Sequence, residues 1–211
     1  MDCAAPRPRR LVLASKNPHK LVELRTLCGL SGEMLVSALE TPGAPDPDEN
    51  GATFIENALI KARALRDFSG EWALADDSGL CVDALGGAPG VLSARYCGRH
   101  GCDGDNNRKL LDDLAALGPK ASRLCHFSCA LALVSPGGRE FAAIGHCPGR
   151  LLFSGRGSDG FGYDPLFLPD GRDKTFAELP REEKCRFSHR AVAAAAMRPV
   201  IRALFGPGCA G

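Results

Sequence analysis

Two adjacent carboxylates, Asp76 and Asp77, directly follow the apolar run 72–75 and are the first candidates for chemistry. At the end of a strand, two like charges must face water or be compensated, because burying them together is costly. Mg²⁺ supplies such compensation, since it binds one or two carboxylates together with substrate phosphates. The acidic loop 46–49 offers a further ligand. The alternative is an acidic turn that water solvates.

A second candidate is the polar loop that follows the apolar run 11–14. Free N–H groups at a helix start, the positive end of the helix dipole and two lysines together suit a phosphate. Helix capping by Ser15 or Asn17 explains part of the pattern equally well. The loop is neither a Walker loop nor a G-x-G-x-x-G turn, which disfavours a Walker-type kinase and a dinucleotide-dependent dehydrogenase. Its members are Ser15, Lys16, Asn17, Pro18, His19 and Lys20.

A third polar set occupies residues 160–164, 182–184 and 188–190. Glycines on both sides of Phe161 free the backbone for close approach to a ligand, and an exposed ring there can stack on a base. Lys184 and Arg190 are donors that suit phosphate or a carbonyl-rich base. The alternative is that both aromatic rings of 160–164 are core and that Ser188 caps a helix.

Apolar periodicity predicts the elements that must position these residues. Helices are expected from residue 18, after Thr53, over 105–117 and over about 189–204, with Thr53 and Glu56 forming a capping box. Strands are expected at 11–14, 34–39 and 72–75, in a hairpin of 123–134 with 139–147, and at 149–153. This order predicts one α/β domain over 1–211, a mixed sheet with helices on its faces, after a frayed leader at 1–9.

The composition excludes several classes of protein. With 26 Lys and Arg against 25 Asp and Glu, the net charge of +1 gives no cationic excess for binding a nucleic acid. No apolar run approaches the roughly 18 to 20 residues that cross a bilayer, and the N-terminal residues do not form a secretory signal. We therefore expect no nucleic acid partner, no membrane and a cytoplasmic location.

The ten cysteines are a high number, but they include no C-x-x-C pair. Structural zinc requires paired, closely spaced ligands. The best local group is Cys97, His100 and Cys102, for which buried or incidental thiols are the favoured explanation. Without a secretory signal the thiols are expected to be reduced.

Six motifs follow one another over nearly the whole chain. They are S-x-N-x-x-K from Ser15, T-F-x-E-N-A-x-x-K-A from Thr53, A-D-D-S-G-L from Ala75, G-G-A-P-G-x-x-S-A-R-Y from Gly86, G-F-G-Y-D-P from Gly160 and S-H-R from Ser188. Together they resemble the inosine triphosphate pyrophosphatase family of bacterial RdgB type, which removes deaminated purine nucleotides. The chain departs from this pattern in its proline-rich leader, in Lys16 where many members carry glycine, and in its cysteines.

The resemblance implies a two-lobed fold around a central nucleotide cleft, usually in a homodimer. It implies hydrolysis of a purine nucleoside triphosphate (dITP, ITP or XTP) to the monophosphate and pyrophosphate, with Mg²⁺ as cofactor. Asp77 would be proton acceptor and metal ligand, with Glu49, or else Asp48, as the second ligand. Residues 15–20 would hold the triphosphate. The other nucleotide contacts would come from Ser78, Phe161, Gly162, Tyr163, Asp164, Lys184, His189 and Arg190.

Two other functions are considered beside this one. A Maf-like nucleotide pyrophosphatase shares the fold type and prefers pyrimidine or other nucleotides, but the motifs at 160–165 and 188–190 argue against it. A nucleotide-binding regulatory module without turnover has no need of Asp77 beside a metal. Mg²⁺-dependent pyrophosphate release distinguishes an enzyme from such a module.

Overall fold

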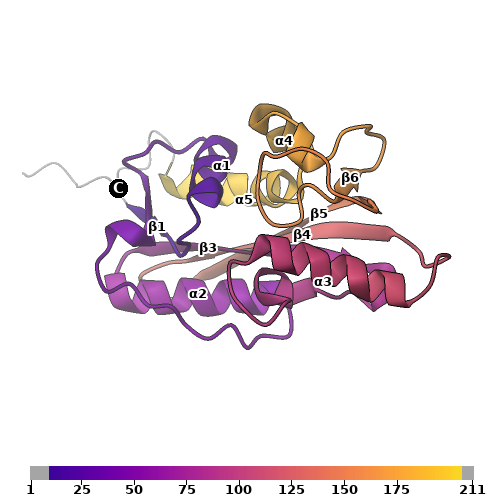
Figure 1. Ribbon diagram of the computed structural model, residues 1–211. Helices are drawn as coiled ribbons and strands as arrows, with labels where there is room; N and C mark the ends of the chain where they lie inside the picture. The colour runs from indigo at the N-terminus through magenta and orange to yellow at the C-terminus, as the bar shows by residue number, and fades with distance from the viewer. Residues whose placement is uncertain (1–9, 206–211) are drawn as a thin grey trace, which may run out of the picture.

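The computed structural model describes residues 10–205 and contains a mixed sheet of six strands in the order β2-β1-β3-β4-β5-β6 (Figure 1). β1 pairs in parallel with β2 and β3, and the other three pairings are antiparallel. The strands are β1 (Leu11–Leu13), β2 (Leu35–Ser37), β3 (Trp72–Val82), β4 (Leu124–Val134), β5 (Glu140–Leu151) and β6 (Phe167–Pro169). The predicted leader at 1–9 lies outside the described residues.

Helices cover both faces of this sheet. α2 (Phe54–Ser69) packs on β3 and β4 from one side, and α5 (His189–Phe205) packs on β4 and β5 from the other. In Figure 1, α1 (Pro18–Cys28) and α4 (Arg181–Phe187) lie on the same side as α5. α3 (Asp103–Ala116) contributes Leu110 and Leu114 to a core cluster that also contains Leu80 and Val82 of β3. The α/β class predicted from the sequence is confirmed.

The α5 face of β3 carries two separate apolar clusters. Leu74 belongs to the cluster beneath α1 and α5, whereas Leu80 belongs to the cluster beneath α3. Side chains alternate between faces along a strand, so Asp76 and Ser78 fall on this same face, between the two clusters. The interval between the clusters is therefore polar, with Asp76 buried and Ser78 partly buried, and the candidate site begins there.

Local signals position the first two helices as predicted. Asn17 caps α1, accepting from the backbone N–H groups of residues 19 and 20, and Pro18 occupies the first turn. Thr53 and Glu56 form the predicted capping box of α2. The resulting helices place residue 20 of α1 and residue 61 of α2 against β3 from opposite sides.

The structure corrects several predicted boundaries. β3 runs unbroken through Asp76 and Asp77, which therefore lie in mid-strand rather than at a strand end, because β4 pairs with β3 from Ala73 to Val82. The strand predicted at 34–39 is shorter, and a 3₁₀ turn (Ala38–Glu40) follows it. The strand predicted at 149–153 is the end of β5, and its partner is β6. α4 was not predicted. None of the helices in the described part of the chain has the length and apolar character to cross a bilayer.

Candidate active site

Asp76 and Asp77 point to opposite faces of β3, so each carboxylate has its own cationic partners. Asp76 accepts from Arg190, with 2.7 Å between Nε and Oδ2, and from Lys20, with 2.6 Å between Nζ and Oδ1. Asp77 accepts from Lys61 on the opposite side of the sheet, with 2.7 Å between Nζ and Oδ1. The expectation that this pair shares one compensating cation is therefore wrong for Asp76, whose charge Arg190 and Lys20 already balance.

The two lysines also meet at the backbone of β3. The carbonyl oxygen of Asp76 lies 3.4 Å from Nζ of Lys20 and 3.0 Å from Nζ of Lys61. β1 ends at Leu13, opposite Leu74, so this edge of β3 has no strand partner at Asp76, and in the described structure it pairs again only at Cys81, through an isolated bridge to Pro89. Two ammonium groups thus converge on one free strand edge, from α1 and from α2. Such an edge suits a polyanion, because the cations are already held in place.

Arg190 is fully buried, and each guanidinium nitrogen has a partner. Besides Asp76, it donates to Glu23 of α1, with 2.6 Å between Nη1 and Oε2, and to Ser78, with 3.0 Å between Nη2 and Oγ. Burial alone would raise the pKa of Asp76, but Arg190 and then Lys20 hold this pKa well below its usual value. Arg190 therefore ties the start of α5 to α1 and β3. Sequence reasoning did not assign Glu23.

Lys61 belongs to the motif that begins at Thr53, but sequence reasoning assigned it no role in the site. Its ammonium stands between two carboxylates, at 2.7 Å from Asp77 and 3.3 Å from Oε1 of Glu49. Burial opposes its charge, but these two carboxylates raise the pKa of Lys61 above its usual value. The sequence does contain an indication of this role. Lys61 lies between Ala58 and Ala62 on the apolar side of α2, and a cation on a buried helix face needs an anionic partner.

The Asp77 side of the strand has the donors that a hard cation prefers. Asp77 is buried, and its Oδ2 has no hydrogen-bond partner among the described residues. The carboxylate of Glu49 lies on the same side of the strand, where it pairs with Lys61. The backbone carbonyl oxygen of Glu49 accepts from Arg95 at 2.9 Å. Asp48, the alternative ligand, is exposed. An unpaired buried oxygen beside a second carboxylate fits Mg²⁺, which takes carboxylate ligands together with phosphate.

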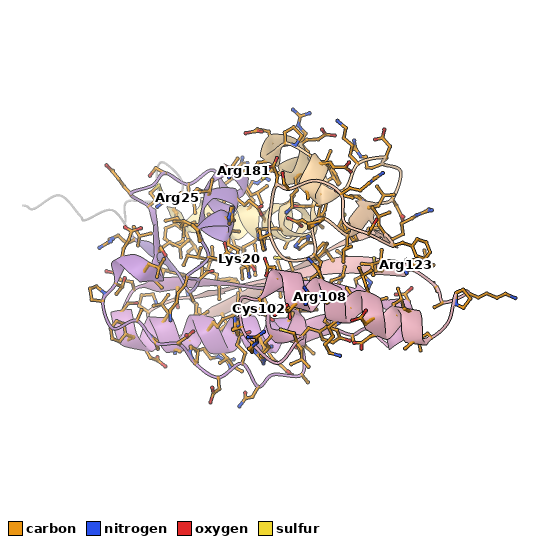
Figure 2. All side chains as sticks on the ribbon, in the orientation of Figure 1. Lys20, Arg25, Cys102, Arg108, Arg123 and Arg181 are labelled. Atoms are coloured by element: carbon orange, nitrogen blue, oxygen red, sulfur yellow. The ribbon has the colours of Figure 1, made fainter. Side chains whose placement is uncertain are left out.

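Residues 15–20 comprise the end of the loop after β1 and the first turn of α1, beside the Asp76 carbonyl. Ser15 Oγ accepts from the N–H of Asn17 at 3.2 Å, and Lys16 forms an exposed ion pair with Asp46 at 2.9 Å. The alternative explanation for Asn17, helix capping, is confirmed. Lys20 lies on the side of α1 that faces β3 (Figure 2). Of residues 15–20, Lys20 alone reaches a carboxylate of β3 in the described structure.

Phe161 is half-buried and lies among cationic and aromatic groups. His19 stacks on its ring at 5.6 Å between centroids and an interplanar angle of 25°. Nζ of Lys184 and Cζ of Arg190 lie 5.1 and 5.8 Å from the centre of the same ring. The structure thus brings residues of α1, α4 and α5 together around Phe161. His19 is separated from the other three residues by more than a hundred positions in the sequence.

The other residues of this segment make hydrogen bonds within the protein. Tyr163 is buried and donates to the carbonyl oxygen of Ser93 at 2.9 Å, so the core explanation is confirmed for this ring. Asp164 is buried and accepts from Lys184, with 2.6 Å between Nζ and Oδ2, and from the N–H of Phe161 at 3.0 Å. Burial raises the pKa of Asp164, and Lys184 partly offsets this. Gly162 is held through its N–H by an oxygen of Asp103 at 2.6 Å.

His189 lies in the core at the start of α5. Its ring stacks on Phe127, with 4.6 Å between centroids, and its Nδ1 is buried without a partner among the described residues. Burial, and then the charges of Arg190 and Lys184, hold the pKa of His189 well below 6.5, so the ring is neutral. Ser188 accepts from the N–H of residue 191 at 3.2 Å, which confirms that it caps the helix.

Several known proteins are similar to this chain in sequence. Residues 11–200 match the model of the Ham1 family. A dITP/XTP pyrophosphatase of Leifsonia xyli subsp. xyli is 52% identical over 201 residues, which cover 94% of this chain and 98% of that protein. A dITP/XTP pyrophosphatase of Streptomyces coelicolor is 48% identical over 199 residues, which cover 93% of this chain and 99% of that protein.

Solved structures agree with these matches. A HAM1 protein from Coxiella burnetii has a TM-score of 0.82 at 38% identity, covering 92% of this chain and 98% of that one. A nucleoside-triphosphatase, or dITP/XTP pyrophosphatase, from Mycobacterium abscessus has a TM-score of 0.72 at 46% identity, covering 90% of this chain and 99% of that one. These matches extend along the whole sheet and its helices, and the chain therefore belongs to the Ham1 family.

Proposed function

We propose that this protein hydrolyses deaminated purine nucleoside triphosphates, dITP, ITP and XTP, to the monophosphate and pyrophosphate. The observation that carries the proposal is the free edge of β3, where Lys20 and Lys61 converge beside Asp77 and its unpaired oxygen. The relatives in Leifsonia and Streptomyces are dITP/XTP pyrophosphatases and match over nearly the whole chain, which supports the same substrates here.

In the proposed reaction Asp77 is the proton acceptor. Its carboxylate orients a water and takes its proton as the oxygen attacks the α-phosphorus. Lys20 and Lys61 offset the negative charge of the phosphates, and the loop at 15–20 holds the triphosphate. Asp77 and Glu49 would hold Mg²⁺, which when bound lowers the charge repulsion on the phosphates. Pyrophosphate is the leaving group, and the monophosphate keeps the new oxygen.

The group around Phe161 is proposed to select the base. A purine stacked on this ring would lie beside Arg190, whose Cζ is 5.8 Å from the ring centre. A 6-keto oxygen accepts hydrogen bonds from Arg190 and from Nδ1 of His189, which has no partner in the described structure. The 6-amino group of ATP cannot accept these bonds, so Nδ1 of His189 would stay unpaired and ATP would bind poorly. Ser78, Gly162, Tyr163, Asp164 and Lys184 are proposed to complete the nucleotide site.

A panel of triphosphates tests the proposal. The full chain with Mg²⁺ is assayed on ITP, dITP, XTP, ATP and the pyrimidine triphosphates, and monophosphate and pyrophosphate are both quantified. We expect kcat/KM for the deaminated purines to exceed that for ATP by about 10²-fold or more. Equal values for ITP and ATP contradict the base selection, and a preference for pyrimidines favours a Maf-like activity. Binding without pyrophosphate release would instead identify a regulatory module.

The homodimer implied by the family is also part of this proposal. Light scattering coupled to gel filtration would measure twice the 22.3 kDa mass of the chain. A monomeric mass at assay concentration contradicts it. The expected cytoplasmic location stays a prediction.

A further inference from the structure

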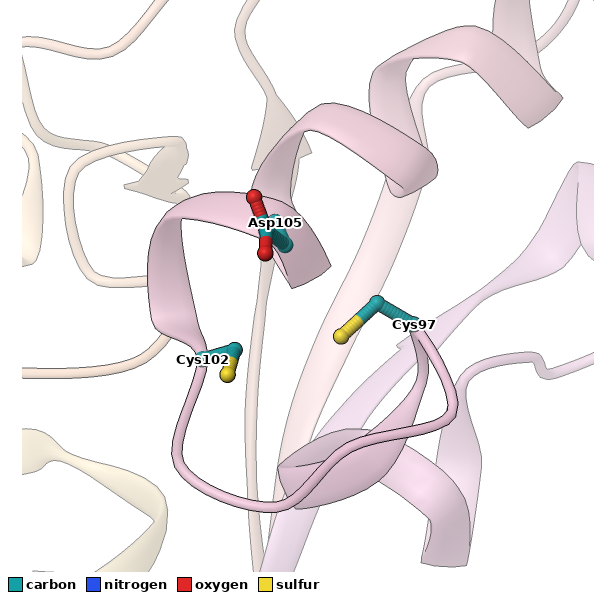
Figure 3. Close-up of side chains that lie close together, drawn as sticks. All are labelled: Cys97, Cys102 and Asp105. Atoms are coloured by element: carbon teal, nitrogen blue, oxygen red, sulfur yellow. The ribbon is translucent and has the colours of Figure 1, made fainter.

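A loop outside the proposed active site gathers three potential ligands for a soft cation. It runs from the 3₁₀ segment η3 (Gly90–Arg95) to the start of α3. Figure 3 shows the side chains of Cys97, Cys102 and Asp105 close together, and their ligand atoms all lie within 4.8 Å of one another. The group expected from the sequence included His100, but the structure replaces it with Asp105. The proposed reaction uses none of these three side chains.

The chemistry of this group favours Zn²⁺ over Mg²⁺. Thiolates are soft ligands that select zinc, whereas Mg²⁺ prefers oxygen. In a tetrahedral site with Zn–S bonds of about 2.3 Å, two sulfurs lie about 3.8 Å apart. Ligand atoms that are already within 4.8 Å need to approach by about 1 Å at most. Both cysteines are only partly buried, so a cation can reach them from solvent.

The loop is already held in the shape that brings these ligands together. The N–H of Cys97 donates to Oδ1 of Asn106 at 2.8 Å, and the N–H of Asn106 donates to the carbonyl oxygen of Cys102 at 2.9 Å. One asparagine thus links both cysteines. In the described structure their thiols donate to the carbonyl oxygens of residues 99 and 100, at 3.7 and 3.8 Å, and these weak bonds cost little to release.

Positive charge lies close to this group of ligands. Cys102 is the N-cap of α3 and makes no side-chain capping bond, so its Sγ lies at the positive end of the helix. Arg99 and Arg108 flank the group and pair with the two oxygens of Asp105 at 2.7 and 3.0 Å. Two thiolates, one carboxylate and Zn²⁺ would leave one net negative charge, and these two arginines more than offset it.

We propose that Cys97, Cys102 and Asp105 bind Zn²⁺, with solvent completing the coordination. The site would brace a loop whose two ends contact opposite parts of the proposed active site. At one end, Arg95 donates to the carbonyl oxygen of Glu49 at 2.9 Å. At the other, Asp103 accepts from Gly162, the neighbour of Phe161, at 2.6 Å. The proposal does not depend on which nucleotide the protein hydrolyses.

Cobalt binding tests the site, because a thiolate bound to Co²⁺ gives a charge-transfer absorption that oxygen ligands do not give. The full chain is reduced, freed of metal with a chelator and titrated with Co²⁺, then with Zn²⁺. We expect saturation at one equivalent and displacement of the band by Zn²⁺. C97S and C102S should each abolish the band, and D105N should weaken Co²⁺ binding about tenfold or more. C185S, at a partly buried cysteine of α4, is the matched control and should keep the band.

A second measurement covers variants that fold poorly. Zn²⁺ should raise the Tm of the wild-type protein and of C185S, but not that of C97S. The proposal is overturned if the wild-type protein shows no thiolate band, or if C97S and C102S keep it. A Cys97–Cys102 disulfide found by mass spectrometry, together with no uptake of Co²⁺ by the reduced chain, would likewise overturn it and identify a redox pair.

Discussion

Lys61, on α2, donates to Asp77, in the middle of β3, over 2.7 Å between Nζ and Oδ1. Burial raises the pKa of Asp77, and the ammonium of Lys61 acts against this, which favours the charged carboxylate. The pair occupies one oxygen of the carboxylate and leaves Oδ2 unpartnered in the described structure. Lys61 thus fixes Oδ1 of Asp77 in place, and Oδ2 of the same carboxylate is available for chemistry.

Replacing Asp77 with Asn should lower kcat by about 10²-fold or more, because the amide cannot accept the proton of the attacking water. The shape of the side chain is kept, so circular dichroism and Tm should report an intact fold. Pyrophosphate release from ITP measures the effect. D67N, at an exposed carboxylate on the far end of α2, is the control and should keep wild-type turnover. Near-native turnover of D77N would refute the assignment.

Replacing Glu49 with Gln should raise the Mg²⁺ concentration needed for half-maximal activity by about tenfold or more, because a charged ligand is lost. D48N is the matched control, since Asp48 is the exposed neighbour in the same acidic loop. Activity is measured over a range of Mg²⁺ concentrations at saturating ITP. If D48N shifts the Mg²⁺ dependence and E49Q does not, the second ligand is Asp48.

Replacing Lys61 with Met should reduce kcat/KM for ITP by about 10²-fold, because the phosphates lose a buried cation and Asp77 then faces Glu49 without it. The apolar part of the side chain is retained, so the packing of α2 changes little. K109M removes a lysine that forms an exposed pair with Asp113 on α3 and should leave the kinetics unchanged. Equal activity of K61M and K109M would show that Lys61 has no role in the reaction.

Replacing Gly79 with Ala should destabilise the protein by about 1–3 kcal/mol. A Cβ at this position of β3 would collide with Ser93 Oγ and with the carbonyl oxygen of Gly90, which pack directly on the strand. Urea denaturation measures the loss. Gly137, in the turn between β4 and β5, has nothing within 4 Å of such a Cβ, so G137A is the control and should change stability little. A G79A protein as stable as G137A contradicts the close packing of η3 on β3.

The neutral, buried ring of His189 predicts a pH-dependent stability. Below about pH 6.5 the unfolded chain binds a proton at this residue and the folded chain does not, so the free energy of unfolding must fall as the pH falls. The slope contributed is up to about 1.4 kcal/mol per pH unit. Urea denaturation at pH 7.5 and pH 5.5 should show a smaller loss for H189Q than for the wild type. H100Q, at an exposed histidine, is the control, and a wild-type slope in H189Q would be inconsistent with a buried neutral ring.

Much of this architecture follows from local chemistry in the sequence. The capping box at Thr53, the Asn17 cap and the apolar spacing of α1 and α5 specify their helices without help from distant residues. Six short motifs, in the same order along the chain as in the family, also identified the family, because each has particular residues at fixed spacings. The predicted ends of strands were wrong where pairing with a neighbouring strand determines them. β3 continues through Asp76 and Asp77 because β4 pairs with it from Ala73 to Val82.

The sequence by itself determined which residues carry charge and most of the helices and strands, though not α4 or β6. Only the tertiary structure decided that Asp76 and Asp77 face opposite sides of the sheet and have different partners, Arg190 for one and Lys61 for the other. The same holds for Asp105, which replaces His100 beside the two cysteines. These pairings join residues through the packing of helices on a sheet, and sequence spacing carries no information about which helix covers which face.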